Sequence, residues 1–123
     1  MAIKIQGTVV LDYDGASYSS TNIAVGASAL ASLTTGTGNV GVGYAALQNN
    51  TTGEYNVGVG FAALVTNTIG STNVGLGYFA LRSNTIGLNN VGVGYYALRY
   101  NTTGNYNVGV GTSALVNNTT GTR

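Results

Sequence analysis

Hydrophobic and polar positions follow one another along this chain in a repeating pattern with a 17-residue period. Each unit opens with an asparagine, continues with an apolar alternation such as Val40-Gly41-Val42, and then holds an alanine–leucine pair before a polar segment of the Asn-Thr-Thr-Gly type. The alternation predicts a strand at residues 39–43 and at the equivalent positions of the other units. The alanine–leucine pair predicts a second short extended or turn-like segment, and the polar segment predicts a loop.

Six such units fill residues 22–123 without an insertion. Helical repeats need longer units, usually above about 30 residues, and use helix formers rather than Gly, Thr and Asn. We therefore predict an all-β fold, a parallel β-solenoid (β-roll) of six 17-residue coils. Stacked coils are spaced by about 4.8 Å, so six coils would span roughly 29 Å. Residues 1–21 form a separate N-terminal strand, cap or attachment segment.

The alternation also predicts which side chains are buried. Val40 and Val42 lie on one face of the strand and Gly41 on the other. We expect the valine face to form the interior, where one leucine of each unit joins it. These leucines are Leu30, Leu47, Leu64, Leu81, Leu98 and Leu115.

The glycine face of the strand predicts an inter-chain contact. Glycine weakens a strand and commonly marks the close approach of another backbone. We interpret the column as a side-chain-free strip against which a second chain packs in a symmetric homo-oligomer. A tight bend in each coil is the alternative, and it suits the second glycine of the unit, Gly43, better. The strip consists of Gly41, Gly58, Gly75, Gly92 and Gly109.

The polar columns have structural explanations. Two asparagine columns, which include Asn39 and Asn50, can form ladders in which each side-chain amide bonds the next coil. A threonine column that includes Thr51 forms another stacked row. Gly53 and its equivalents are expected to take the positive φ of the loop.

The repeated glycines also match a dinucleotide-binding fingerprint, G-x-G-x-x-A. That fingerprint works once, inside a βαβ unit of about 30 residues. Here it occurs five times, and a 17-residue unit is too short to hold that crossover. We therefore expect no cofactor.

Composition excludes further functions. Four basic and three acidic residues cannot build the phosphate-neutralising surface that nucleic-acid binding requires. Without Cys or His, thiolate chemistry, the usual zinc sites and the commonest general base are missing. Asp12 and Asp14, a close carboxylate pair, are too few ligands for calcium, and no apolar run approaches the length of a membrane span. We predict a protein that is not an enzyme, holds no metal, binds no nucleic acid and does not insert into a membrane.

One column is aromatic in the four middle units and could contact a glycan or a partner protein. Alternatively, these rings pack along the solenoid at a corner or between chains. The column consists of Tyr44, Phe61, Tyr78 and Tyr95. Further aromatic residues in the middle and late units are Tyr55, Phe79, Tyr96, Tyr100 and Tyr106.

The two ends of the repeat array suggest further contacts. The last unit finishes at Arg123 without a capping segment, and an open coil offers unpaired backbone groups to another chain. Residues 3–13 have strand propensity. They could cap the first coil of their own chain, or complete the open end of a neighbour by strand addition and so produce head-to-tail stacking.

The repeat "NVGVGYAAL..NTTG" is similar to the N-x-V-A-I-G-x-x-A repeats in the heads of trimeric autotransporter adhesins of the YadA type. It resembles more closely the arrays in bacteriophage tail-fibre and related virion proteins. In the adhesin heads, such repeats form a left-handed parallel β-roll assembled as a tight trimer, so the resemblance implies that Val40, Val42 and their equivalents lie inside the roll. The period here is longer than that of the adhesin type, so the loop is larger.

These observations favour a non-enzymatic structural protein of a phage fibre or surface appendage, located on a virion or an extracellular surface. Its expected partners are copies of itself, in a homotrimer or stacked head to tail, and other virion proteins. The alternative is an adhesin-like head that holds a cell-surface glycan through the aromatic column.

Overall fold

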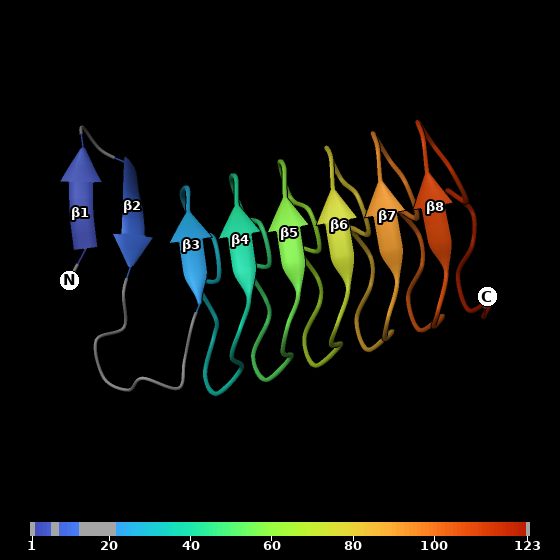
Figure 1. Ribbon diagram of the computed structural model, residues 1–123, viewed down its shortest axis with the longest axis horizontal. Coiled ribbons are helices and arrows are strands. Elements are labelled where there is room, and N and C mark those ends of the chain that lie inside the picture. Colours follow the sequence, from blue (N-terminus) through green and yellow to red (C-terminus); the bar gives the residue numbers. More distant parts are fainter. Residues whose placement is uncertain (1, 6–7, 13–21, 123) are drawn as a thin grey trace.

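The computed structural model describes residues 2–5, 8–12 and 22–122, and residues 22–122 form one β-solenoid (Figure 1). Six of its strands lie side by side in a single parallel sheet and pair in chain order. They are β3 (Ile23–Val25), β4 (Val40–Val42), β5 (Val57–Val59), β6 (Val74–Leu76), β7 (Val91–Val93) and β8 (Val108–Val110). The predicted all-β fold and parallel solenoid are confirmed.

Two further strands precede the solenoid. Strands β1 (Ala2–Ile5) and β2 (Thr8–Asp12) pair antiparallel with each other and belong to a separate sheet. Residues 6, 7 and 13 of the predicted cap at residues 3–13 lie outside the described residues. Asp14 lies outside them too.

The 17-residue period fixes the register of the sheet. Val40 pairs with Val57, and Gly41 pairs with Gly58. The same pairing recurs from each strand to the next. Because no unit carries an insertion, equivalent residues stack directly on one another and form continuous columns along the solenoid.

The second side of each coil is a chain of tight turns, which confirms the turn-like interpretation of the alanine–leucine segment. The bend begins at Gly43, whose φ is 127°, as expected for the second glycine. The Ala46 N–H donates to the Gly43 carbonyl at 3.3 Å, and the Gln48 N–H donates to the Ala45 carbonyl at 3.2 Å. The intervening Leu47 N–H donates instead to the adjacent coil. Local and inter-coil hydrogen bonds therefore alternate along this segment.

The core of the solenoid is a single column of leucines with a column of alanines beside it. Leu47, Leu64, Leu81 and Leu98 are fully buried, and so is Ala46. This narrow cross-section reverses the predicted orientation of the strand. The glycine at the centre of each strand from β4 to β8 is buried, and the two flanking aliphatic residues are partly buried in β4 to β7 and exposed in β8.

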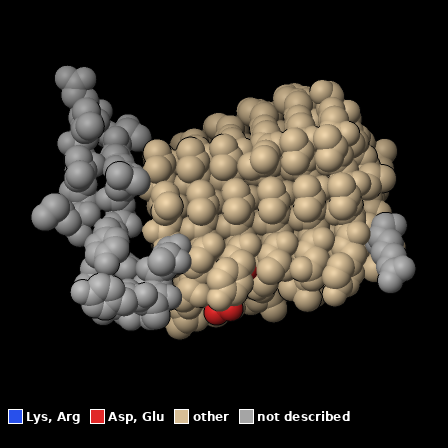
Figure 2. Space-filling view, viewed as in Figure 1, with Lys and Arg blue, Asp and Glu red and all other residues tan. Residues whose placement is uncertain are grey.

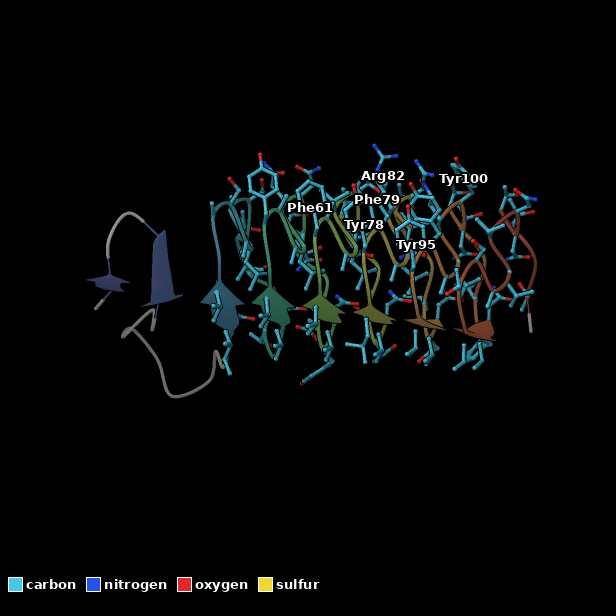
Figure 3. All side chains as sticks on the ribbon, turned by 90° about the horizontal axis from the view of Figure 1, so that it is seen from above. Phe61, Tyr78, Phe79, Arg82, Tyr95 and Tyr100 are labelled. Carbon is cyan, nitrogen blue, oxygen red and sulfur yellow. The ribbon has the colours of Figure 1, made fainter. Side chains whose placement is uncertain are left out.

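The valines therefore do not form the interior, and this corrects the sequence-based prediction. A Cβ built on Gly41 would lie 3.1 Å from the Ala46 carbonyl oxygen and 3.4 Å from Leu30 Cγ. One leucine already fills the space opposite the strand, so the inner face of β4 to β8 has room for glycine, whereas the first strand, β3, carries Ala24 at this position. Val40 and Val42 take the outer face, and Figure 3 shows the strand side chains pointing away from the coil.

Both asparagine ladders are present and buried. The Asn56 Nδ2 donates to Asn39 Oδ1 at 3.1 Å and to the Gly70 carbonyl at 2.8 Å. In the second ladder, Asn67 Nδ2 donates to Asn50 Oδ1 at 2.8 Å and to the same Gly70 carbonyl at 2.9 Å. The two ladders thus share one acceptor in the loop and tie it to the body of the coil.

The loop glycines have a different role from the one predicted. The positive-φ residues of the loop are Gly38, Tyr55 and their equivalents, and not the Gly53 column. Glycine is needed in that column for space, because a Cβ at Gly70 would overlap the side-chain oxygen of Asn67. The described part of the chain contains no helix with the length and apolarity required to cross a membrane.

Candidate functional site

The solenoid has two chemically different sides. The strands and their outward aliphatic side chains lie along one edge in Figure 3. Phe61, Tyr78 and Arg82 lie along the opposite edge, on the chain of turns (Figure 3). We call these the valine face and the aromatic face.

The valine face consists of two aliphatic residues from each of the six strands, stacked in two columns. Figure 2 shows this side as regular rows of uncharged side chains, with an acidic side chain below the rows and no basic side chain among the described residues. Its outward residues are Ile23, Val25, Val40, Val42, Val57, Val59, Val74, Leu76, Val91, Val93, Val108 and Val110. Contiguous apolar surfaces of this kind on soluble proteins commonly mark interaction sites.

The predicted glycine strip does not lie on the surface. Gly41, Gly58, Gly75, Gly92 and Gly109 are all buried, and each faces the leucine column of its own chain. These glycines therefore allow the strand to lie close to the leucine column of its own chain and to the alanine carbonyl of the same coil. A second chain that meets the sheet from outside would contact valines.

The predicted aromatic column is a continuous ring stack at the surface. The centroids of Tyr44 and Phe61 are 5.2 Å apart, and those of Phe61 and Tyr78 are also 5.2 Å apart, with interplanar angles of 18° and 15°. Tyr78 and Tyr95 follow at 5.4 Å and 11°. Neighbouring rings partly cover one another's faces in such an offset stack. The column thus presents mainly ring edges and hydroxyl groups to the outside, and the rings are 42–55% exposed.

A second row of rings lies beside this stack in the fourth and fifth coils. Phe79 and Tyr96 occupy a column that holds Ala45 and Ala62 in earlier coils. Both adopt left-handed backbone conformations, with φ of 57° and 62°, as the alanines do. Tyr96 stacks on Tyr95 at 4.0 Å, so the rings of the two rows are in contact.

Two arginines cover the second row. The Arg82 Cζ lies 5.1 Å from the centroid of the Phe79 ring. The Arg99 Cζ lies 4.3 Å from the centroid of Tyr96, 4.9 Å from that of Tyr100 and 5.2 Å from that of Phe79. These distances are within the range of cation–π attraction. The Nε of Arg99 is buried and has no hydrogen-bond partner among the described residues.

Charge on the aromatic face is positive and uncompensated. Arg82 and Arg99 are the only basic residues within residues 22–122, and Glu54 is the only acidic residue there. A hydrogen bond with Tyr96 is the largest of the effects that raise the pKa of Tyr95 above its usual value. Tyr95 therefore remains a neutral hydroxyl at physiological pH.

Sequence reasoning identified the aromatic column but missed the arginines. Arg82 and Arg99 occupy equivalent positions of successive units and therefore stand in one column, which is the signal that could have found them. The described residues contain no group of three or more Cys, Asp or Glu side chains that could hold a metal ion. Comparison with family models, curated proteins and solved structures finds no match for this chain.

Proposed function

We propose that this chain is a non-enzymatic structural protein of a phage fibre or surface appendage, and that it assembles through its valine face as a homotrimer. The observation that carries the proposal is the outward orientation of the twelve aliphatic side chains of the sheet. A face of this composition is unfavourable in water and gains stability when a second copy covers it.

The strands support packing of one copy against another in register. Each column of the valine face repeats the same aliphatic side chain with little variation, so copies placed around an axis parallel to the solenoid would present matching rows along their whole length. The choice of three copies rests on the resemblance of the repeat to trimeric adhesin heads and phage fibre arrays. The buried asparagine ladders and the buried leucine column suit a rigid shaft, because hydrogen bonds and packing join every coil to the next.

The oligomer is tested by the native mass of the purified chain. Multi-angle light scattering and native mass spectrometry should give about three times the 12.4 kDa of a single chain. A monomer at micromolar concentration would contradict the proposal. The location is tested separately, by immunogold labelling with antibodies against the chain, which should decorate fibres on virus particles or on cell surfaces.

The adhesin-like alternative is favoured by the composition of the aromatic face. If the valine face lies against the axis of an oligomer, the aromatic face points outward, where a ligand could reach it. A fibre component can carry such a site, so the two functions are compatible.

A further inference from the structure

Arg82 and Arg99 form a like-charge pair on adjacent coils. Neighbouring coils of a parallel solenoid are about 4.8 Å apart, and like charges placed opposite one another on neighbouring strands are destabilising. The fold does not require arginine here, because the same column holds Gln48, Val65 and Val116 in other coils. Contacts with the neighbouring rings attract the two guanidinium groups, but the repulsion between them remains.

The surrounding rings position the guanidinium groups but do not neutralise them. Phe79 lies near both arginines, and Tyr96 and Tyr100 flank Arg99. A guanidinium carries five N–H donors, and at least one donor of Arg99, the buried Nε, is unpaired. An anion is the ligand that would supply the missing opposite charge and accept from the other guanidinium N–H groups.

We propose that the arginine–aromatic surface binds an acidic saccharide that carries carboxylate groups. This surface consists of Tyr78, Phe79, Arg82, Tyr95, Tyr96 and Arg99. The guanidinium groups pair with sugar carboxylates, for which their planar donor geometry is suited. The exposed edges and hydroxyls of Tyr78 and Tyr95 contact the adjoining sugar ring and its hydroxyl groups.

The same geometry disfavours the other polyanions. Single-stranded nucleic acid binds where aromatic faces are free for bases to stack on them and many cations track the backbone. Here the Tyr78 and Tyr95 rings are stacked on each other at 5.4 Å, and residues 22–122 contain only two basic side chains. An acidic peptide would also pair with the arginines, but a chain such as poly-glutamate has no ring to lie along the exposed edges of Tyr78 and Tyr95.

The test compares acidic polysaccharides with matched neutral ones on the assembled protein. Biolayer interferometry would use immobilised polygalacturonate, alginate and hyaluronate, with methyl-esterified polygalacturonate as the uncharged counterpart and poly-glutamate as the peptide counterpart. We expect binding to at least one acidic polysaccharide, its loss on esterification, and weaker binding at high salt.

The variants separate this site from the rest of the chain. The double substitution Arg82→Gln and Arg99→Gln introduces the residue that stands naturally at position 48, so the solenoid should fold with an unchanged native mass. It should weaken polysaccharide binding at least about tenfold, a loss consistent with removing charge-assisted hydrogen bonds. Tyr95→Phe should weaken polysaccharide binding but leave any residual binding of poly-glutamate unchanged. The control Glu54→Gln should bind as the unmodified protein does.

Several results would overturn the inference. They are equal binding of the esterified polymer, undiminished binding by the double variant, poly-glutamate binding as tight as the polysaccharide, and no binding to any of the three acidic polymers. None of these results bears on the valine face, because the native mass reports the proposed oligomer independently of any ligand.

Discussion

The side chain of Leu47 lies against Gly58 of the following coil, so closely that a Cβ built on the glycine would stand 3.3 Å from Leu47 Cγ. The same Cβ would be 3.2 Å from the Ala63 carbonyl oxygen, which belongs to the backbone and cannot move freely. A single leucine side chain therefore fills the interior of each coil. The strand must turn its larger side chains outward.

Substitution of Gly58 should consequently destabilise the fold. We expect Gly58→Val to lower the free energy of unfolding by about 2 kcal/mol or more, because overpacking a close-packed core typically costs about 1–3 kcal/mol. Denaturation by guanidinium chloride, followed by circular dichroism, measures the change. The control is Thr52→Ile in the preceding coil, an exposed position where Ile69 and Ile86 stand in the next two coils. A Gly58→Val protein as stable as this control would show that the core has spare room.

The asparagine ladder should be most sensitive in its middle. Asn84 donates to Asn67 Oδ1 at 2.8 Å and to the Gly87 carbonyl at 3.2 Å, and it accepts from Asn101 at 3.0 Å. Asn84→Ala removes the ladder partner of Asn67 Oδ1 and of Asn101 Nδ2, whereas the Gly87 carbonyl keeps its bond from Asn73 Nδ2 at 2.7 Å. An unsatisfied buried group costs about 1–3 kcal/mol, so we expect a loss of at least about 2 kcal/mol of stability.

The matched control for the ladder lies at its last position. Asn118 makes one ladder bond, to Asn101 Oδ1 at 2.8 Å, and is only partly buried. Asn118→Ala should lower stability by less than about 1 kcal/mol. Equal midpoints of thermal unfolding for the two alanine variants would mean that the ladder is not a source of stability.

The fold class and the register could be read from the sequence because both depend only on the period. A constant repeat length stacks each asparagine on the next, whatever the cross-section of the coil. The orientation of the strand could not be read in the same way. The alternation of Val40, Gly41 and Val42 defines two faces, and the choice between them rested on the general rule that the larger apolar face is buried. That rule fails here because the coil is too narrow to hold more than its leucine.

The sequence also does not predict which residues adopt a positive φ. Glycine was expected to mark positive φ in the loop, yet Tyr55 adopts a φ of 57° there, and Leu47 adopts 53° on the second side of the coil. Hydrogen bonds between coils hold these residues in conformations that they would not favour alone. The arginine pair was missed for another reason, since its significance depends on the aromatic rings that the turns bring beside it.

A charged residue on the valine face should separate the proposed copies without unfolding the chain. Val59 points outward from β5, near the middle of the sheet. In Val59→Lys the ammonium group is solvated in a lone chain but buried in an assembly, where an unpaired charge is very costly. We expect the native mass to fall to that of one chain while the β-type circular dichroism spectrum is retained.

Two further variants complete the test of the valine face. Thr52→Lys adds the same charge at an exposed loop position and should leave the assembly intact. If the lysine variant does not fold, Val59→Thr takes its place, because it keeps the shape of the side chain. Its assembly should dissociate at a higher protein concentration than that of the unmodified protein. Persistence of the full native mass in both Val59 variants would place the interface elsewhere.

The pKa of Tyr95 should depend on its neighbour. Because a hydrogen bond with Tyr96 raises this pKa above the usual value of 10.0, Tyr96→Phe should lower it towards that value. The unfolded chain loses its Tyr95 proton at a lower pH than the folded chain, so this tyrosine reduces stability only as the pH rises above about 10. NMR titration of Cζ-labelled tyrosine measures the shift, and an unchanged Tyr95 pKa in the variant would exclude the hydrogen bond as its cause.

The aromatic rings and the leucine column should contribute very differently to stability. Leu81 is fully buried in the core, and Leu81→Ala should cost about 2–5 kcal/mol because it removes the one large apolar side chain that is buried in its coil. Phe79 lies two residues earlier, with a φ of 57° in a column where Ala62 stands one coil before at 53°. Phe79→Ala therefore introduces the residue that already adopts this backbone conformation at position 62. It should lower the free energy of unfolding by about 1 kcal/mol, mainly through lost contacts with Arg82 and neighbouring rings. Chemical denaturation of both variants measures the difference. A loss for Phe79→Ala as large as that for Leu81→Ala would mean that the second ring row belongs to the core, whereas a small loss leaves these rings free to serve recognition.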